Sequence, residues 1–265
     1  MSTDLARIGE KARREPALAF TSLYHHVTDV DNLRACYDAL PGDRAEGFDG
    51  ITKEEYGKDL DAKLQDLSAR LKRMGYRPKP AQRWYIPKAG SLKGRPLGIS
   101  CFEDKIVQLA LKRVLEPLYE PLFVDDSFGY RPGRSQPACL DKLGRTIQQA
   151  RVNFIVEADI QSFFDEVNHQ WLKRFLQHRV GDPRIIRLVN RFLKAGIMED
   201  GLIRETESGT AQGSILSPLL SNVYLHHALD ECVRAWFKDR CRGQTYYFRF
   251  ADDCAPRKLV QELVS

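Results

Sequence analysis

No stretch of the sequence approaches the apolar length that a membrane-spanning helix needs. Residues 1–14 are polar and lack the apolar segment of a secretory signal. Cysteine is also scarce, with six in 265 residues, and neither a C-x-x-C pair nor a histidine pair with metal-ligand spacing to cysteine occurs. These absences argue against a zinc site and favour reduced thiols in a cytoplasmic protein.

Acidic residues are missing from one segment, Arg70 to Arg95, although the chain as a whole carries 36 Asp and Glu against 41 Lys and Arg. Nine cations in this segment are interleaved with Tyr76, Trp84 and Tyr85. Because cations neutralise phosphates and aromatic rings stack on bases, the segment suits a nucleic-acid surface. A solvated basic face would have the same composition, and the net charge of +5 does not decide between the two.

The apolar content of 43% is enough for a substantial core, and the residue patterns predict a mixed α+β chain without internal repeats. Asp29 is expected to cap a helix that ends at Pro41, and Thr52 with Glu55 forms a capping box. Other expected elements are helices at 104–116 (broken by Pro117), 135–150, 168–178, 182–194 and 218–237, strands at 83–86, 95–99 and 244–250, a turn at 87–90 and a hairpin around 200–201.

Aspartates stand at the ends of two predicted strands. Residues 153–158 have the pattern of a buried strand that ends on Asp159, and the strand at 244–250 leads into Asp252 and Asp253. Adjacent carboxylates repel each other, so a third one beside them calls for a cation. Two magnesium ions on such carboxylates are suited to in-line displacement at phosphorus. Taken alone, an Asp-Asp pair is more often an exposed turn.

The surrounding residues resemble the conserved blocks of reverse transcriptases. Five segments occur in the family's order: 83–88 with 94–99, then 104–105, 115–117 and 127–135, then 158–165, then 208–222, and finally 246–253. The run Ser217–Asn222 and the motif Gly47–Gly50 in the N-terminal extension are similar to the group II intron type. CRISPR-associated and other bacterial reverse transcriptases share the palm blocks and remain alternatives.

This resemblance implies the fold of a right-hand polymerase, with helix-rich fingers and an antiparallel palm sheet. Its domains would be residues 1–80, an N-terminal extension with the start of the fingers, 81–150, the fingers, and 151–254, the palm. Asp159, Asp252 and Asp253 would be catalytic and would bind two Mg²⁺ ions, helped by the backbone carbonyl of Ile160.

The resemblance also implies contacts with substrate. Lys88 and Arg95 would bind the triphosphate of the incoming nucleotide, Gln212 would lie near its sugar, and Phe164 would exclude a 2′-hydroxyl, whereas Phe163 is expected in the core. Arg83, Arg131 and Arg134 would contact RNA, although Arg134 would serve equally well in a structural ion pair. The partners would be RNA template and primer, deoxynucleoside triphosphates and group II intron RNA, without a membrane.

The sequence departs from the family after Cys254. Pro256 cannot donate to a sheet ladder, so the hairpin of Asp252 and Asp253 is expected to have only one convincing strand. Residues 255–265 do not match the family, and no thumb follows within the sequence. The chain is therefore expected to be a truncated polymerase with impaired activity, whose open palm edge would allow self-association. The alternative is a non-catalytic, maturase-like protein that binds intron RNA.

Overall fold

The computed structural model describes residues 3–88, 91–150, 152–199, 201–204, 208–210, 213–254 and 257–258. The chain divides into two compact units. Unit 1 comprises Met1–Pro121 and Phe164–Ser217, and unit 2 comprises Leu122–Phe163 and Pro218–Ser265. Among the described helices, none is both long and apolar enough to cross a membrane.

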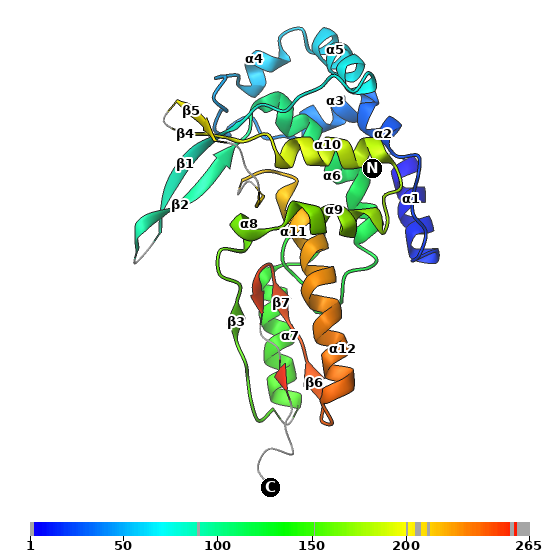
Figure 1. Ribbon diagram of the computed structural model, residues 1–265, viewed down its shortest axis with the longest axis vertical. Coiled ribbons are helices and arrows are strands. Elements are labelled where there is room, and N and C mark those ends of the chain that lie inside the picture. Colours follow the sequence, from blue (N-terminus) through cyan, green and yellow to red (C-terminus); the bar gives the residue numbers. More distant parts are fainter. Residues whose placement is uncertain are drawn as a thin grey trace. The chain divides into compact units, whose positions relative to one another are not determined.

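Unit 1 is mainly helical, with one four-stranded sheet. Its strands are ordered β2-β1-β4-β5, and β1 and β2 form a long antiparallel hairpin beside which β4 runs parallel to β1 (Figure 1). The elements are α1 (Thr3–Arg14), α2 (Tyr24–Thr28), α3 (Val30–Ala39), α4 (Lys53–Gly57), α5 (Leu60–Lys72), β1 (Ala81–Lys88), β2 (Ser91–Ile99), α6 (Phe102–Tyr119), α8 (Phe163–Glu166), α9 (His169–Gln177), α10 (Pro183–Leu193), β4 (Ile197–Glu199) and β5 (Leu202–Arg204).

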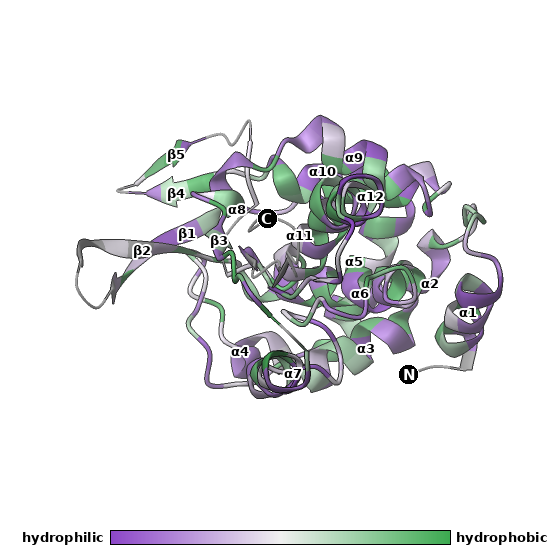
Figure 2. Cartoon of the chain, turned by 90° about the horizontal axis from the view of Figure 1, so that it is seen from below, coloured by the Kyte–Doolittle hydropathy of each residue, from purple (hydrophilic) through white to green (hydrophobic). Residues whose placement is uncertain are grey.

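Local capping explains where several of these helices begin. The Asp29 side chain accepts a hydrogen bond from the backbone of Asp31 at the start of α3, and Thr52 accepts one from Glu55 at the start of α4. Helix α10 is amphipathic, with one apolar face toward the core. It carries both hydrophobic (green) and hydrophilic (purple) residues in Figure 2. These predicted elements are confirmed, including the helix at 168–178 and the hairpin at β4 and β5.

A buried arginine attaches the N-terminal helix to the rest of unit 1. Arg179 is 1% exposed, and its guanidinium donates to the backbone carbonyls of Ala12, Glu15, Pro16 and Leu18 at 2.6–2.9 Å. The carbonyls at a helix C-terminus have no partner within the helix. Arg179 therefore satisfies the end of α1 and the turn that follows it.

Unit 2 consists of short strands between helices. Its elements are α7 (Gln136–Gln149), β3 (Ala158–Asp159), α11 (Ser217–Leu225), the π-helical segment η1 (His226–Asp230), α12 (Glu231–Arg240), β6 (Thr245–Tyr246), β7 (Arg249–Phe250), β8 (Asp253–Cys254) and β9 (Arg257–Lys258). One antiparallel sheet has the order β3-β8-β7, and a second pairs β6 with β9. The predicted helix at 218–237 is thus continuous to Arg240 through its π segment.

The side chains of residues 246–250 pack alternately against two different sets of helical residues. Phe248 is buried with Phe128 and Cys139 of α7, and Tyr246 and Phe250 pack against the same cluster. Tyr247 instead packs toward Leu229, Val233 and Phe237 of the helix run from α11 to α12. This two-residue period is that of a strand covered on both faces, although only 245–246 and 249–250 form ladders.

Several sequence predictions are wrong. Helix α6 continues through Pro117 to Tyr119, because burial of Leu118 and Tyr119 on its apolar face offsets the one backbone hydrogen bond that Pro117 cannot donate. Strand β1 extends through the predicted turn residues Pro87 and Lys88, whereas residues 89–90 lie outside the described part. Residues 153–158 are exposed rather than buried, and only Ala158 and Asp159 form a strand, at the edge of the sheet.

Two further corrections concern the nucleic-acid surface and the aspartate hairpin. Tyr76 is buried at 1% exposure and donates its hydroxyl to Asp104, so it is part of the core and is not a stacking surface. The hairpin has its second strand, because β8 pairs with both β7 and β3. Beyond Pro256, which is outside the described residues, β9 also pairs with β6.

Candidate functional site

The sheet β3-β8-β7 of unit 2 brings the predicted aspartates together. Asp159 ends β3 and lies directly opposite Asp253 of β8 in the antiparallel register. Asp253 is in turn paired with Phe250 of β7, so Ala251 and Asp252 form the turn between the two strands. Ala251 has a φ of 57°, in the left-handed region that permits so tight a turn.

Electrostatics at these strand ends favour a bound cation. Desolvation raises the pKa of Asp253, and the neighbouring carboxylates of Asp252 and Asp159 raise it further. Mutual repulsion of this kind is relieved when a divalent ion binds the oxygens. The donor set, carboxylates with the backbone carbonyl of Ile160 beside them, is of the hard oxygen type that Mg²⁺ prefers.

The ligand atoms of all three aspartates do not form one compact cluster in the described structure. A cluster with all ligand atoms within 4.8 Å occurs instead at His226, His227 and Glu231. Here Nδ1 of His227 lies 2.9 Å from the Glu231 carboxylate, and the His226 ring packs edge-on against Phe123. The spacing of these histidines to cysteine gave no metal-site signal, and the signal that the sequence does hold is the pair His226-His227 with Glu231 one helical turn later. The Asp159 and Asp253 side chains already lie within hydrogen-bonding reach of each other, so a common ion would require mainly that Asp252 turn toward them.

The predicted nucleotide-binding residues of the fingers lie in unit 1. Lys88 ends β1, and Arg95 of β2 pairs with Ile86 of β1, so both belong to one hairpin. Gln212 lies outside the described residues, but its neighbour Gly213 is packed onto β2, where an added Cβ would come within 2.7 Å of the Gly98 carbonyl. Gly213, the residue after Gln212 in the sequence, therefore adjoins the strand that carries Arg95.

Phe163 and Phe164 have different environments. Phe163 is buried in unit 2, with its ring 6.1 Å from Tyr224, which confirms that it belongs to the core. Phe164 is half-buried in unit 1, and its carbonyl accepts a hydrogen bond of 2.7 Å from the Thr210 amide. The role of Phe164 in sugar selection stays a prediction.

The three arginines predicted to contact RNA also have local environments. Arg131 is 6% exposed and donates to the carbonyls of Val124 and Ser127 at 2.6 and 2.8 Å. Arg134 lies 3.5 Å from the Asp125 carboxylate, which agrees with the alternative prediction of a structural ion pair. Arg83 is half-buried on β1. Their contacts with RNA stay predictions.

The basic segment is partly neutralised by acids distant in sequence. Arg70 binds Glu103 through two hydrogen bonds of 2.7 and 2.9 Å, and Lys79 lies 3.0 Å from Asp49. Asp49 belongs to the motif Gly47–Gly50, so this motif is attached to the segment by an ion pair. Trp84 and Tyr85 of β1 remain 55% and 59% exposed, as a stacking surface requires.

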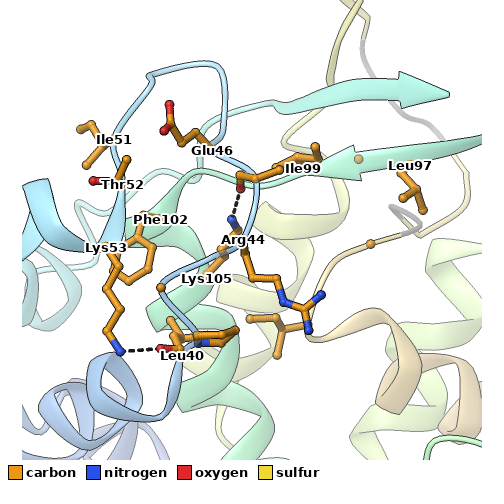
Figure 3. Close-up of a pocket in the computed structure, with 16 residues that line it drawn as sticks. Leu40, Arg44, Glu46, Ile51, Thr52, Lys53, Leu97, Ile99, Phe102 and Lys105 are labelled. Carbon is orange, nitrogen blue, oxygen red and sulfur yellow. Dashed lines mark hydrogen bonds between the residues drawn. The ribbon is translucent and has the colours of Figure 1, made fainter. Parts of the chain in front are cut away.

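A cavity of about 450 Å³ adjoins this part of unit 1. Its wall is formed by the loop between α3 and α4, the end of β2 and the start of α6 (Figure 3). Figure 3 shows the Arg44 side chain extending from the loop, with Phe102 and Lys105 on one side of it and Leu97 farther away on the other. Gly213 and Ile215 complete the wall.

Comparison with known proteins identifies the family. The family model described as "Reverse transcriptase (RNA-dependent DNA polymerase)" matches residues 86–255. The chain belongs to the reverse transcriptase family. Members of this family generally use Mg²⁺.

The chain has a relative whose name places it in the group II intron type. It is 38% identical over 229 residues to the Group II intron-encoded protein LtrA of Lactococcus lactis subsp. cremoris, covering 86% of the chain and 38% of the relative. It is 34% identical over 247 residues to Protein YkfC of Escherichia coli (strain K12), covering 89% of the chain and 64% of the relative. The reverse transcriptase chain thus spans less than two thirds of each.

A solved structure supports the fold. A chain of the partial Cas6-RT-Cas1–Cas2 complex aligns with a TM-score of 0.53 and 22% identity, over 91% of this reverse transcriptase and 39% of that chain. At this identity the likeness concerns the fold alone. The α+β fold of helix-rich fingers with an antiparallel palm sheet is confirmed.

Proposed function

We propose that this chain carries the nucleotidyl-transfer centre of a group II intron reverse transcriptase. The primer 3′-hydroxyl attacks the α-phosphorus of a deoxynucleoside triphosphate, a new phosphodiester bond forms, and pyrophosphate leaves. The observation that carries the proposal is the register of Asp159 opposite Asp253 on β3 and β8, with Asp252 in the adjoining turn.

The aspartates are proposed to hold two Mg²⁺ ions, with the Ile160 carbonyl as a further ligand. Bound there, the ions would activate the attacking oxygen and stabilise the leaving group. The raised pKa of Asp253 fits this assignment, because a carboxyl group crowded by two others gains most from a neighbouring cation.

Residues of unit 1 are proposed to bind and select the nucleotide. Lys88 and Arg95 would bind the triphosphate, Gln212 would contact the sugar, and Phe164 would block a 2′-hydroxyl. In support, Lys88 and Arg95 share one hairpin, and Gly213 packs beside Gly98 on the same strand pair. The division into an N-terminal extension (1–80), fingers (81–150) and palm (151–254) belongs to this proposal.

RNA is the proposed template and partner. The exposed Trp84 and Tyr85 with the nearby cations would contact RNA through phosphates and base stacking, and Arg83, Arg131 and Arg134 are assigned to the same role. Intron RNA as a second ligand, self-association through the palm edge and location in the cytoplasm are further parts of the proposal.

A primer-extension assay tests the function directly. In a form of the protein that extends an oligo(dT) primer on poly(A) RNA, Asp252→Asn should lower the incorporation rate by about three orders of magnitude or more, because a metal ligand is lost. RNA affinity should stay unchanged, since Asp252 is not part of the basic surface. The matched control is Asp239→Asn, an exposed acid of α12, which should behave like wild type.

Wild-type incorporation in Asp252→Asn would contradict the assignment. Tight RNA binding without incorporation in any tested form would instead favour the alternative, a maturase-like RNA-binding protein.

A further inference from the structure

Arg249 of β7 is a buried charge that the chemistry proposed above does not use. Arg249 and Asp230 are both 0% exposed. The Nε and Nη2 atoms of Arg249 donate to the two carboxylate oxygens of Asp230, each at 2.8 Å. Its Nη1 atom donates to Asn222 Oδ1 at 3.1 Å and to the carbonyl of Ala251 at 2.8 Å. The guanidinium thus connects a helix to the turn before Asp252.

Stability alone is a weak reason for such a pair. Desolvation of two buried charges offsets most of their attraction, and apolar side chains of similar size often stabilise a core as well. Here Asp230 also accepts a hydrogen bond of 2.8 Å from the Tyr247 hydroxyl, so its carboxylate has three donors. The direction of these bonds, toward one particular turn, indicates a role in geometry.

The π-helical segment η1 allows Asn222 and Asp230 to act together. They are eight residues apart, which in a regular α-helix puts them roughly 80° apart around the axis. A π turn takes up one extra residue. Asn222 and Asp230 are therefore placed as if they were seven residues apart in an α-helix, and the angle between them around the axis falls to about 20°. Both side chains can therefore reach Arg249 from one face of the helix run between α11 and α12.

The loop at residues 124–129 encloses the same arginine from its other side. The Arg249 amide donates to the Asp126 carbonyl at 2.9 Å, and the Arg249 carbonyl accepts from the Phe128 amide at 2.8 Å. Asn222 Nδ2 donates to the Gly129 carbonyl at 2.8 Å. A Cβ on Gly129 would lie 2.2 Å from the Ala251 nitrogen, so only glycine allows the loop this close to the turn.

These contacts meet at a strained point of the backbone. Ala251 has a φ of 57°, which is unfavourable for a residue with a Cβ and persists only where the surroundings determine it. The guanidinium on its carbonyl and the loop against its nitrogen hold it there.

We propose that Arg249, fixed by Asp230 and Asn222, is a positioning residue that sets the turn at Ala251 and so the placement of Asp252 and Asp253 opposite Asp159. The assignment of a chemical role to those aspartates rests on the proposed function. The placement itself does not depend on that function.

The test compares Arg249→Lys and Asp230→Asn with Arg179→Lys in the 265-residue chain. Arg179 is the matched control, since it is an equally buried arginine whose hydrogen bonds go to backbone carbonyls of unit 1 and whose guanidinium lies over the Phe20 ring. Three properties are measured: the thermal midpoint, hydrogen exchange of the segment 249–254, and Mn²⁺ affinity by electron paramagnetic resonance. Arg249→Lys and Asp230→Asn should speed exchange of the segment and weaken Mn²⁺ binding by about 10- to 100-fold, whereas Arg179→Lys should affect only the thermal midpoint.

The double variant Arg249→Met/Asp230→Leu separates positioning from stability. It removes both charges, so the thermal midpoint should return toward that of wild type while exchange of the segment stays fast. The proposal is overturned if exchange of residues 249–254 in folded Arg249→Lys or in the double variant equals that of wild type. If wild type itself binds no Mn²⁺ at the aspartates, the proposed function fails, but the exchange data still decide the role of Arg249.

Discussion

Phe164 is the single side chain with the most specific predicted role. If its ring blocks the 2′ position, Phe164→Ala should lower the discrimination against ribonucleotides by about 10- to 100-fold. The measurement is the ratio of kcat/KM for a deoxynucleotide and its ribonucleotide in an extending form of the protein. Phe163→Ala is the control: Phe163 is buried, so the change should cost about 3–5 kcal/mol of stability and leave the ratio unchanged. An unchanged ratio in folded Phe164→Ala would place the sugar filter elsewhere.

Asp104 of α6 predicts a pH-dependent stability. Burial raises its pKa to about 7, although the Tyr76 hydroxyl and the Lys79 amide donate to its carboxylate and lower it. The folded state therefore holds a proton that the unfolded chain, with a pKa near 3.8, releases. The contribution of Asp104 to the free energy of unfolding is complete below about pH 4. It falls by about 4 kcal/mol as the pH rises to about 7.

Chemical unfolding at pH 5 and pH 8 measures this effect. Asp104→Asn should reduce the difference in unfolding free energy between the two pH values, whereas Asp38→Asn, at an exposed position, should not. An Asn variant that keeps the full pH dependence would show that other groups cause it.

Sequence alone located the aspartates but not the residues that support them. Asp159, Asp252 and Asp253 stand at the ends of apolar or aromatic segments, where an acid is conspicuous. Asp230 lies on a helix, where acids are usually exposed, and its burial depends on Arg249 arriving from a strand 19 residues later. The sequence hint to this support is that Arg249 stands between Phe248 and Phe250 in a predicted strand.

Among the elements, those specified by neighbouring residues were predicted best. Asp29 and Thr52 act as caps through hydrogen bonds to backbone amides only two or three residues away. The segment at 153–158 was predicted to be buried because it is apolar, but burial depends on a covering partner elsewhere in the fold. Phe154, Ile155 and Val156 precede the edge strand β3 and are 46–56% exposed, which no local pattern could indicate.

The hairpin of β1 and β2 yields a prediction about two ligands. Lys88→Ala and Arg95→Ala should each raise KM for the nucleotide by about tenfold, because a charge-assisted contact to phosphate is lost. RNA affinity and its salt dependence should change little, whereas Trp84→Ala should weaken RNA binding by about 1–3 kcal/mol. Steady-state kinetics and RNA titrations at several salt concentrations check both. Equal losses in nucleotide and RNA binding would identify Lys88 and Arg95 as template contacts.

At the level of the whole molecule, the 265 residues by themselves are expected to extend primers slowly and with low processivity. The strands that carry the aspartates are only two residues long, and the rate of metal-assisted displacement falls steeply with small misplacements. The chain also spans 38% of LtrA, so the segments of that relative outside the match are natural candidates for added contacts.

The experiment compares the lengths of cDNA made by two proteins. One is the chain alone, and the other is the chain fused to the segment that follows the matched region in LtrA. The fusion should extend further per binding event. Efficient, processive synthesis by the chain alone would contradict this expectation.

The contact of Arg179 with the end of α1 has a consequence for synthesis on the ribosome. The carbonyls of Ala12, Glu15, Pro16 and Leu18 accept hydrogen bonds from Arg179, which is translated at least 161 residues after them. At roughly 5–20 residues per second, the delay is about 8 to 32 s. During that time α1 can already pack on α6, but the carbonyls at its end lack the guanidinium, so a nascent-chain protease should cleave near residues 12–18 faster before Arg179 leaves the exit tunnel than afterwards.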